Sequence, residues 1–179
     1  KADIPAARTL LGLSALPSGH PLNMGMLGMH GSYAPNVMEN KCDVLIAIGM
    51  RFSDRVTGRL DTYAKQAKVI HLDIDKAEID KNVKTDVAVV GDCKISLAAI
   101  TRQLKKNDHT AWKESFKPYF EQENQKVIQP AIHPKDGPLL MGEIVNAVAE
   151  ATHGDAVLVN DVGQNQMFSC RYFKYNKKR

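Results

Sequence analysis

The chain has 179 residues, of which 44% are hydrophobic and 25% are charged, and its formal net charge is +4. This composition is typical of globular proteins and excludes the disordered and collagen-like classes. The length suffices for one well-buried domain, or for one domain and part of another.

Targeting and redox signals are few. No apolar run reaches the roughly 18 residues of a membrane span, and no signal segment is present. The three cysteines, Cys42, Cys93 and Cys170, form no CxxC pair, which is typical of a reducing compartment. We therefore expect a cytoplasmic protein without a membrane partner.

Basic residues are scattered along the chain except for the cluster Lys174–Arg179. Such a cluster is one way to contact nucleic acid, but a solvated end or a cut point in a longer protein explains it better, so we expect no nucleic-acid partner. The chain begins at Lys1 without a Met and ends on an aromatic-rich segment without a helix stop. We therefore expect a fragment.

The first third of the chain contains two expected strands. Residues 6–11 form a short apolar run closed by Gly12, which predicts a buried strand, and residues 13–27 read as a loop. Residues 31–40 predict a helix with Ser32 as its N-cap. Residues 44–49 are continuously apolar, which predicts a parallel strand covered on both faces.

Two more strands and two helices follow. Residues 68–75 and 85–91 predict strands, and residues 95–105 predict a helix whose apolar stripe contains Leu97, Ile100 and Leu104. Residues 112–124 predict another helix. Strands that alternate with helices predict an α/β fold with a doubly wound, mostly parallel sheet.

The remainder predicts the opening of a second α/β unit. Residues 125–137 are proline-rich and aperiodic, and we expect them to link a domain at 1–124 to a partial domain at 138–179. In that partial domain we expect a helix at 139–151, a strand at 156–160 and a final helix after 161–167. The apolar face of the first of these helices is predicted to consist of Leu140, Ile144, Val145 and Val148.

The segment from Gly25 to Arg59 is the best candidate for a site. Gly25, Gly28 and Gly31 are spaced by three, and a polar loop with Arg51, Asp54 and Arg55 follows the strand at 44–49. Ligands of open α/β sheets lie beyond the carboxyl ends of the strands, and Arg is a preferred partner of phosphate. This pattern predicts a site for an anionic, nucleotide-like ligand.

Each of these features has a structural alternative. A flexible connector also uses glycines, and Arg51, Asp54 and Arg55 can form a salt-bridge cluster among themselves. Asp73, Asp75 and Asp92 end strands, where an acid can accept hydrogen bonds from a ribose or cap the next helix. The histidines and cysteines show no metal-ligand spacing.

Five motifs in order along the chain resemble the large, catalytic subunit of acetohydroxyacid synthase, also called acetolactate synthase. They are the stretch from Pro17 through His20-Pro-Leu to Gly25-Met-Leu-Gly-Met-His-Gly31, Gly49-Met-Arg-Phe-Ser-Asp-Arg-Val-Thr-Gly58, His71-Leu-Asp-Ile-Asp-Lys-Ala-Glu-Ile79, Val90-Gly-Asp92 and Asp161-Val-Gly-Gln-Asn-Gln-Met167. The resemblance implies most of the central, FAD-binding domain, lacking its first strand, and the start of the C-terminal thiamine-diphosphate domain.

The resemblance also implies cofactor contacts. FAD, which is structural in this family, is expected to contact His30, Gly31, Gly49, Met50, Arg51, Asp54, Arg55, Val56, Asp73, Ile74, Asp92 and Cys93. The aminopyrimidine of thiamine diphosphate is expected to contact Gly163, Gln164, Asn165, Gln166 and Met167. Two residues depart from the family pattern: Ser53 stands where an aspartate is usual, and Asn165 where a histidine is usual.

The implied activity belongs to a larger protein. The family decarboxylates pyruvate and joins the remaining two-carbon unit to pyruvate or 2-oxobutyrate, in the synthesis of branched-chain amino acids. The family's catalytic glutamate and its magnesium-binding segment have no counterpart in these residues, so we expect the chain alone to be inactive. A homo-oligomer of catalytic subunits and a small regulatory subunit are the implied partners.

Two other functions remain open. One is a different thiamine-diphosphate carboligase or oxidase, such as glyoxylate carboligase or pyruvate oxidase, which share the central fold. The other is a nucleotide-binding or regulatory module without catalysis.

Overall fold

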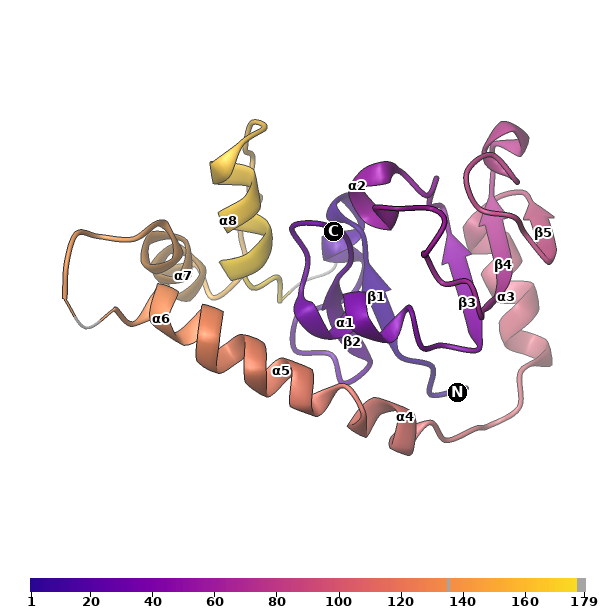
Figure 1. The fold of residues 1–179 in the computed structure, drawn as a ribbon, viewed down its shortest axis with the longest axis horizontal. Coiled ribbons are helices and arrows are strands. Elements are labelled where there is room, and N and C mark those ends of the chain that lie inside the picture. The colour runs from indigo at the N-terminus through magenta and orange to yellow at the C-terminus, as the bar shows by residue number, and fades with distance from the viewer. Residues whose placement is uncertain (135, 177–179) are drawn as a thin grey trace. The chain divides into compact units, whose positions relative to one another are not determined.

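A computed structural model describes residues 1–134 and 136–176, which form two compact units. The first unit contains residues 1–4 and 37–109, and the second contains residues 5–36 and the described chain from residue 110 onward. The predicted class, α/β with parallel sheets, is confirmed in both units (Figure 1).

The first unit is built on a three-stranded parallel sheet in the order β3-β4-β5. These strands are Val44–Ile48, Lys68–Asp73 and Val87–Val90, close to the three apolar runs predicted to be strands. Ile48 pairs with Leu72, and Asp73 pairs with Val90. The carboxyl ends of the three strands therefore meet at one edge of the sheet.

One face of this sheet carries the core of the first unit. Side chains alternate between faces along a strand, so Ala47 of β3 and Val69 of β4 point to the same side. They pack with Phe52, Tyr63 and Ala64 in one buried cluster. Phe52 and Tyr63 meet edge to face, with ring centroids 6.1 Å apart.

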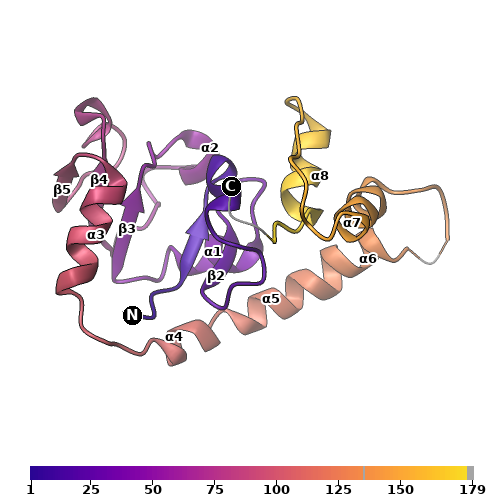
Figure 2. The same ribbon diagram turned by 180° about the vertical axis from the view of Figure 1, so that it is seen from behind.

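The other face is covered only in part. Helix α3 (Cys93–Gln103), predicted at 95–105, packs along β4, as the view from behind shows (Figure 2). Leu72 is fully buried, but Val44, Ile46 and Ile48 of β3 remain 38–44% exposed. The prediction that this strand is covered on both faces is therefore wrong in the described structure, because α3 lies over β4.

The second unit contains a smaller parallel sheet of β1 (Ala6–Arg8) and β2 (Asn23–Met26). The predicted first strand is shorter than 6–11, because a 3-10 helix begins at Leu10 and runs to Ala15. The prediction that this strand is buried is wrong, since Ala6 and Ala7 are exposed. The prediction of a loop at 13–27 is wrong at β2. The sequence did not indicate this strand, because it contains Asn23 and Gly25 and both residue types are rare in strands. Parallel pairing with β1 stabilises it.

Helices make up most of the second unit. Helix α1 (Tyr33–Met38) falls within the predicted helix 31–40, and its first four residues belong to this unit. Helices α4 (Thr110–Glu114) and α5 (Lys117–Glu123) replace the single helix predicted at 112–124. The helical path continues through a π-helical turn at Asn124–Ile128 into α6 (Gln129–Ile132).

Part of the segment predicted to be a linker is thus helical. Pro130 lies just after the π-helical turn Asn124–Ile128, where the irregular hydrogen bonding accommodates a residue without an amide hydrogen. Lys135, also in this segment, lies outside the described residues. The assignment of 125–137 as a boundary between domains stays a prediction.

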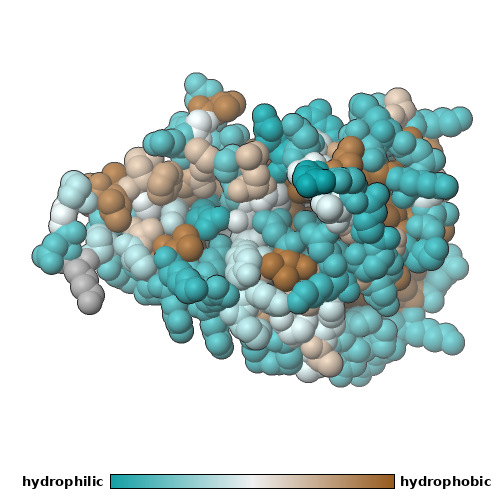
Figure 3. Space-filling view, viewed as in Figure 1, coloured by the Kyte–Doolittle hydropathy of each residue, from teal (hydrophilic) through white to brown (hydrophobic). Residues whose placement is uncertain are grey.

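Helix α7 (Met141–Ala151) confirms the helix predicted at 139–151, but it buries a different face. Gly142, Asn146 and Ala149 are buried, whereas Leu140, Ile144 and Val148 are 37–43% exposed. Val145, the fourth residue of the predicted apolar face, is half-buried. Gly142 lets α7 approach α6, because a Cβ there would lie 2.7 Å from the carbonyl oxygen of Ala131. Figure 3 shows hydrophobic side chains at the surface over α7 and α8.

Residues 156–160, predicted to be a strand, have no regular secondary structure and pair with no described strand, and Val157 and Val159 are 70% and 88% exposed. The prediction fails because a strand needs a neighbouring strand for its backbone hydrogen bonds, and no described strand pairs with this segment. The predicted final helix is confirmed as α8 (Gln164–Tyr172). Within the described residues, no helix is long and apolar enough to cross a membrane.

Candidate nucleotide site

Three segments are tied together at the carboxyl edge of the larger sheet. The amide of Gly49 donates to the carbonyl of Leu72 at 2.8 Å, and the amide of Gly91 donates to the carbonyl of Asp73 at 2.9 Å. The thiol of Cys93 lies 3.7 Å from the carbonyl oxygen of Leu72. The structure therefore brings Gly49, Asp73, Asp92 and Cys93 together, as the sequence predicts.

The loop after β3 is anchored by Phe52. Its side chain is 1% exposed and lies edge-on to His71, with ring centroids 5.0 Å apart. Its backbone has φ +50°, a left-handed conformation that costs a non-glycine residue roughly 1–2 kcal/mol. The side-chain amide of Asn82 donates to the carbonyls of Arg51 and Phe52, at 3.3 and 3.1 Å. Burial of Phe52 and these two hydrogen bonds offset the strain.

Charged residues precede and follow Phe52 in this loop. Arg51 is exposed, and its guanidinium forms no ion pair with the described residues. Asp54 and Arg55, in the short helix α2 (Asp54–Thr57), pair at 3.0 Å with side chains 74% and 72% exposed. The salt-bridge alternative therefore holds for Asp54 and Arg55 but not for Arg51.

The remaining residues of this loop play smaller structural roles. Met50 and Val56 are half-buried, and Met50 packs against the core cluster. Ser53 is the N-cap of α2, but its side chain makes no capping hydrogen bond. Thus Ser53, at a position where the resemblance implies an aspartate, leaves the start of α2 without a side-chain cap.

The three aspartates at the strand ends have distinct roles. Asp75 accepts from the amide of Ala77 at 2.8 Å, and Asp92 accepts from the amide of Ile95 at 3.0 Å, so both cap helices. Asp73 is 8% exposed, and its Oδ1 accepts from the amide of Asp75 at 2.9 Å. Ile74, beside it, is 71% exposed. Asp73 is therefore a buried carboxylate at the sheet edge, next to an exposed apolar side chain.

The glycine-rich segment belongs to the second unit, where its glycines have structural roles. The side-chain amide of Asn36 bonds both the amide and the carbonyl of Gly28, at 2.9 and 2.8 Å. A Cβ on Gly31 would lie 2.2 Å from the carbonyl oxygen of Met26. Met26 is buried, whereas His30 is exposed. The segment is a tightly packed turn with one imidazole at its surface.

A cavity of about 240 Å³ lies beside this turn, within the second unit. His30, Gly31, Arg8, Cys170, Arg171 and Lys174 are among the residues that line it. Burial raises the pKa of the Cys170 thiol and lowers the pKa of Arg8. The cavity wall is therefore rich in cationic groups, and its thiol is held in the neutral form.

The segment 163–167 is also in the second unit. Gly163 has φ +131° and stands directly before α8. Gln164 and Asn165 are exposed, and Gln166 and Met167 are half-buried. These residues thus present amide groups at the start of a helix. A common site for His30 and Gly31 with the residues of the first unit stays a prediction.

Sequence reasoning missed several residues that shape these sites. His71 interrupts an apolar strand, a signal that was available in the sequence. The contacts of Asn82, Glu123 and Arg171 join segments that are far apart in the chain, so no local pattern indicates them.

Residues 1–100 match the family model described as "Thiamine pyrophosphate enzyme, central domain". The chain belongs to this family. The matched residues include most of the first unit and, in the second unit, the strands β1 and β2.

The predicted resemblance to acetolactate synthase is also confirmed. The chain is 39% identical to acetolactate synthase 1, chloroplastic, of Nicotiana tabacum, over 98% of the chain and 26% of that protein. It is 40% identical to a probable acetolactate synthase large subunit of Methanocaldococcus jannaschii, over 98% of the chain and 30% of that protein. It is 38% identical to the acetolactate synthase large subunit of Lactococcus lactis, over 100% of the chain and 30% of that protein. The chain therefore spans about a third or less of these relatives.

Proposed function

We propose that this central domain belongs to an acetolactate synthase, which decarboxylates pyruvate and joins the remaining two-carbon unit to pyruvate or 2-oxobutyrate. The products serve the synthesis of valine, leucine and isoleucine. The observation that carries this proposal is the match to acetolactate synthases over nearly the whole chain, together with the assembled edge of the β3-β4-β5 sheet.

The residues at that edge fit FAD, the flavin nucleotide that we propose as the structural cofactor. A diphosphate needs cationic and amide donors, and exposed Arg51, with no ion-pair partner in the described structure, stands directly after Gly49 and Met50. A ribose needs an acceptor, and Asp73 supplies a buried carboxylate. Ile74 offers apolar surface for an aromatic ring.

The start of α8 fits the aminopyrimidine of thiamine diphosphate. Gln164, Asn165 and Gln166 carry amides that both donate and accept hydrogen bonds, as an aminopyrimidine requires. When bound, thiamine diphosphate supplies the nucleophilic carbon of the reaction. An amide at Asn165, in place of the usual histidine, remains neutral at every physiological pH. We propose that Mg²⁺ is held outside these residues, because the resemblance places the magnesium-binding segment elsewhere in the larger protein.

The proposed setting follows the resemblance. We propose a cytoplasmic enzyme that acts on 2-oxo acids, assembles as a homo-oligomer of catalytic subunits and associates with a small regulatory subunit. The positions that would activate the thiamine ring have no counterpart in this chain, so the chain by itself is proposed to be inactive.

The activity is tested by expressing the coding sequence that contains these codons, out to its own start and stop. The product is assayed for acetolactate with pyruvate, thiamine diphosphate, Mg²⁺ and FAD. Acetolactate formation by this product, and none by the 179-residue chain, is the expected result. Oxidation or glyoxylate condensation in its place contradicts the proposal and favours the related carboligases and oxidases. A start codon directly before Lys1 and a stop after Arg179 favour the non-catalytic module.

A further inference from the structure

Arg171 of α8 reaches back to the glycine-rich turn. Its guanidinium donates to the carbonyl of Gly31 at 2.6 Å and lies 3.5 Å from the carbonyl oxygen of His30. All three residues lie in the second unit, and the arginine side chain is 24% exposed. A largely buried guanidinium thus fixes two successive carbonyls of the turn that carries His30.

Glu123 of α5 completes the arrangement from the other side. Its Oε1 pairs with Arg171 at 3.2 Å, and its Oε2 accepts from the amide of Tyr33 at 2.9 Å. The Glu123 side chain is 8% exposed. Tyr33 also packs edge-on against Tyr119 of the same helix, with centroids 5.4 Å apart. The carboxylate therefore holds the first amide of α1 and orients the guanidinium.

The two side chains form one network around residues 30–33. Removing either partner of a buried, hydrogen-bonded ion pair leaves the other charge uncompensated, so the pair acts as a unit. The helix that supplies Arg171 begins with Gln164, directly after Gly163. The network therefore joins the turn with His30 and Gly31 to the helix that carries the segment 163–167.

We propose that Glu123 and Arg171 are positioning residues that hold the His30–Tyr33 turn in place and couple it to α8. This inference rests on the proposed function, because it gives the pair a purpose: a contact made by His30 and Gly31 with FAD and a contact made by α8 with thiamine diphosphate are kept in one geometry. Any shift of α8 is transmitted to the turn through Arg171.

The first test measures hydrogen exchange of the Gly31, Ser32 and Tyr33 amides in the purified chain. All three amides are hydrogen-bonded, to Gly28, Met26 and Glu123. Arg171→Met is expected to speed their exchange at least tenfold, since a charged hydrogen bond is lost. Arg171→Lys keeps the positive charge but loses the planar guanidinium with its several donors. Its exchange rate is expected to lie between those of the unaltered chain and Arg171→Met. Glu123→Gln speeds exchange of the Tyr33 amide, and the double variant Glu123→Gln/Arg171→Met is no faster than its faster parent.

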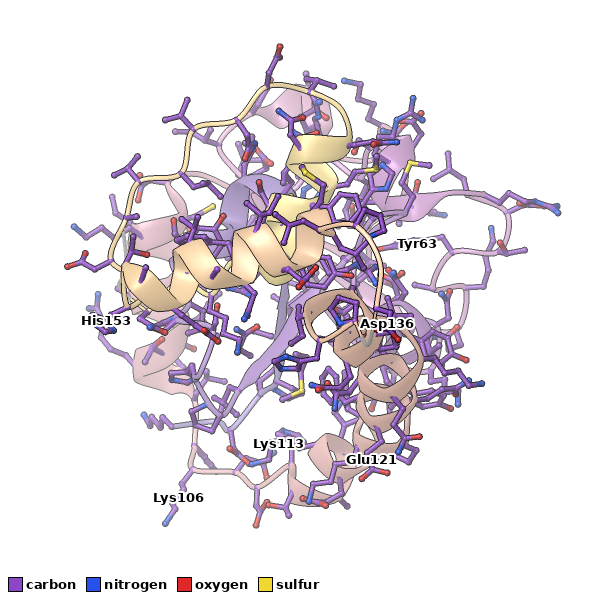
Figure 4. The ribbon with its side chains drawn as sticks, turned by 90° about the vertical axis from the view of Figure 1, so that its left-hand side faces the viewer. Tyr63, Lys106, Lys113, Glu121, Asp136 and His153 are labelled. Carbon is purple, nitrogen blue, oxygen red and sulfur yellow. The ribbon has the colours of Figure 1, made fainter. Side chains whose placement is uncertain are left out.

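Two matched controls belong to this experiment. Lys117→Met removes an exposed ion pair with Glu114 in the same unit. Glu121→Gln changes an exposed carboxylate on the helix that carries Glu123, at a position labelled in Figure 4. Both are expected to exchange like the unaltered chain. Unchanged exchange at residues 31–33 in Arg171→Met and Arg171→Lys overturns the inference.

A second readout separates this inference from the flavin proposal. FAD titration of the unaltered chain and of Arg171→Lys is expected to show weaker binding in the variant, by about tenfold. If the exchange data show the coupling while the unaltered chain does not bind FAD, the positioning role stands and the flavin assignment fails. If FAD binds both proteins equally, the pair does not position a flavin contact and the inference is overturned.

Discussion

The imidazole of His71 lies with its Nε2 3.7 Å from Oδ2 of Asp73, two residues along the same strand and on the same face of the sheet. The His71 side chain is fully buried, and neither ring nitrogen has a hydrogen-bond partner in the described structure. A buried polar ring thus stands directly behind the carboxylate proposed to contact the ribose of FAD.

Substitution of His71 separates packing from polarity. His71→Leu removes two unpaired nitrogens at similar volume, and we expect the free energy of unfolding to stay within about 1 kcal/mol. His71→Ala leaves a cavity beside Phe52 and is expected to lower the free energy of unfolding by about 2–4 kcal/mol. Urea unfolding measures both. Equal losses in the two variants would show that the ring nitrogens are satisfied in solution.

Glu39 predicts a pH dependence of stability in the first unit. Burial raises the pKa of its carboxyl from 4.5 to about 7. The folded state therefore holds the proton more tightly than the unfolded state. The contribution of Glu39 to stability is therefore greatest below pH 4.5, falls as the pH rises through about 7 and is level above that.

Glu39→Gln is expected to remove this dependence. The amide stays neutral, so the variant gains stability relative to the unaltered chain between pH 5 and pH 8, by on the order of 2 kcal/mol. Chemical unfolding across this pH range measures the gain. Tyr63, labelled in Figure 4, lies beside the carboxyl, and burial raises the pKa of its phenol as well. Identical pH profiles for the variant and the unaltered chain would contradict the prediction.

Gly31 predicts a steric requirement in the turn. Gly31→Ala places a Cβ 2.2 Å from the carbonyl oxygen of Met26, so the backbone must move. We expect a loss of about 3 kcal/mol in the free energy of unfolding, at the upper end for overpacking. Gly19→Ala is the control, since nothing lies within 4 Å of its Cβ. A Gly31→Ala variant as stable as this control would show that the turn is looser than described.

The larger sheet and its edge were predictable because β3 and β5 are continuous apolar runs, β4 is apolar between its ends except at His71, and polar residues follow each strand. The predictions that were wrong concern features that depend on contacts with other elements. Asn23 and Gly25 are unfavourable in strands, and β2 forms because it pairs with β1. The buried face of α7 follows from the close approach that Gly142 permits, and not from its apolar residues.

The candidate site was predictable to a similar degree. The order of Gly49, Arg51 and Asp73 along the chain indicated a strand-end site, and the structure assembles Gly49 and Asp73 at one edge. The anchoring of the loop by Phe52 and Asn82 could not be predicted, because it joins residues 30 positions apart. The pair Glu123–Arg171 spans 48 positions and was missed for the same reason.

The most direct test of the flavin site is a titration of the purified chain with FAD, followed by flavin fluorescence and thermal stability. The unaltered chain is expected to bind saturably at micromolar FAD. Arg51→Ala is expected to weaken binding at least tenfold without loss of stability, because this exposed guanidinium contributes to the ligand and not to the fold. Arg59→Ala, which removes an exposed arginine paired with Asp61, is expected to bind like the unaltered chain. Equal FAD affinity in all three proteins, or no saturable binding by any of them, contradicts a flavin site at this edge of the sheet in the purified chain.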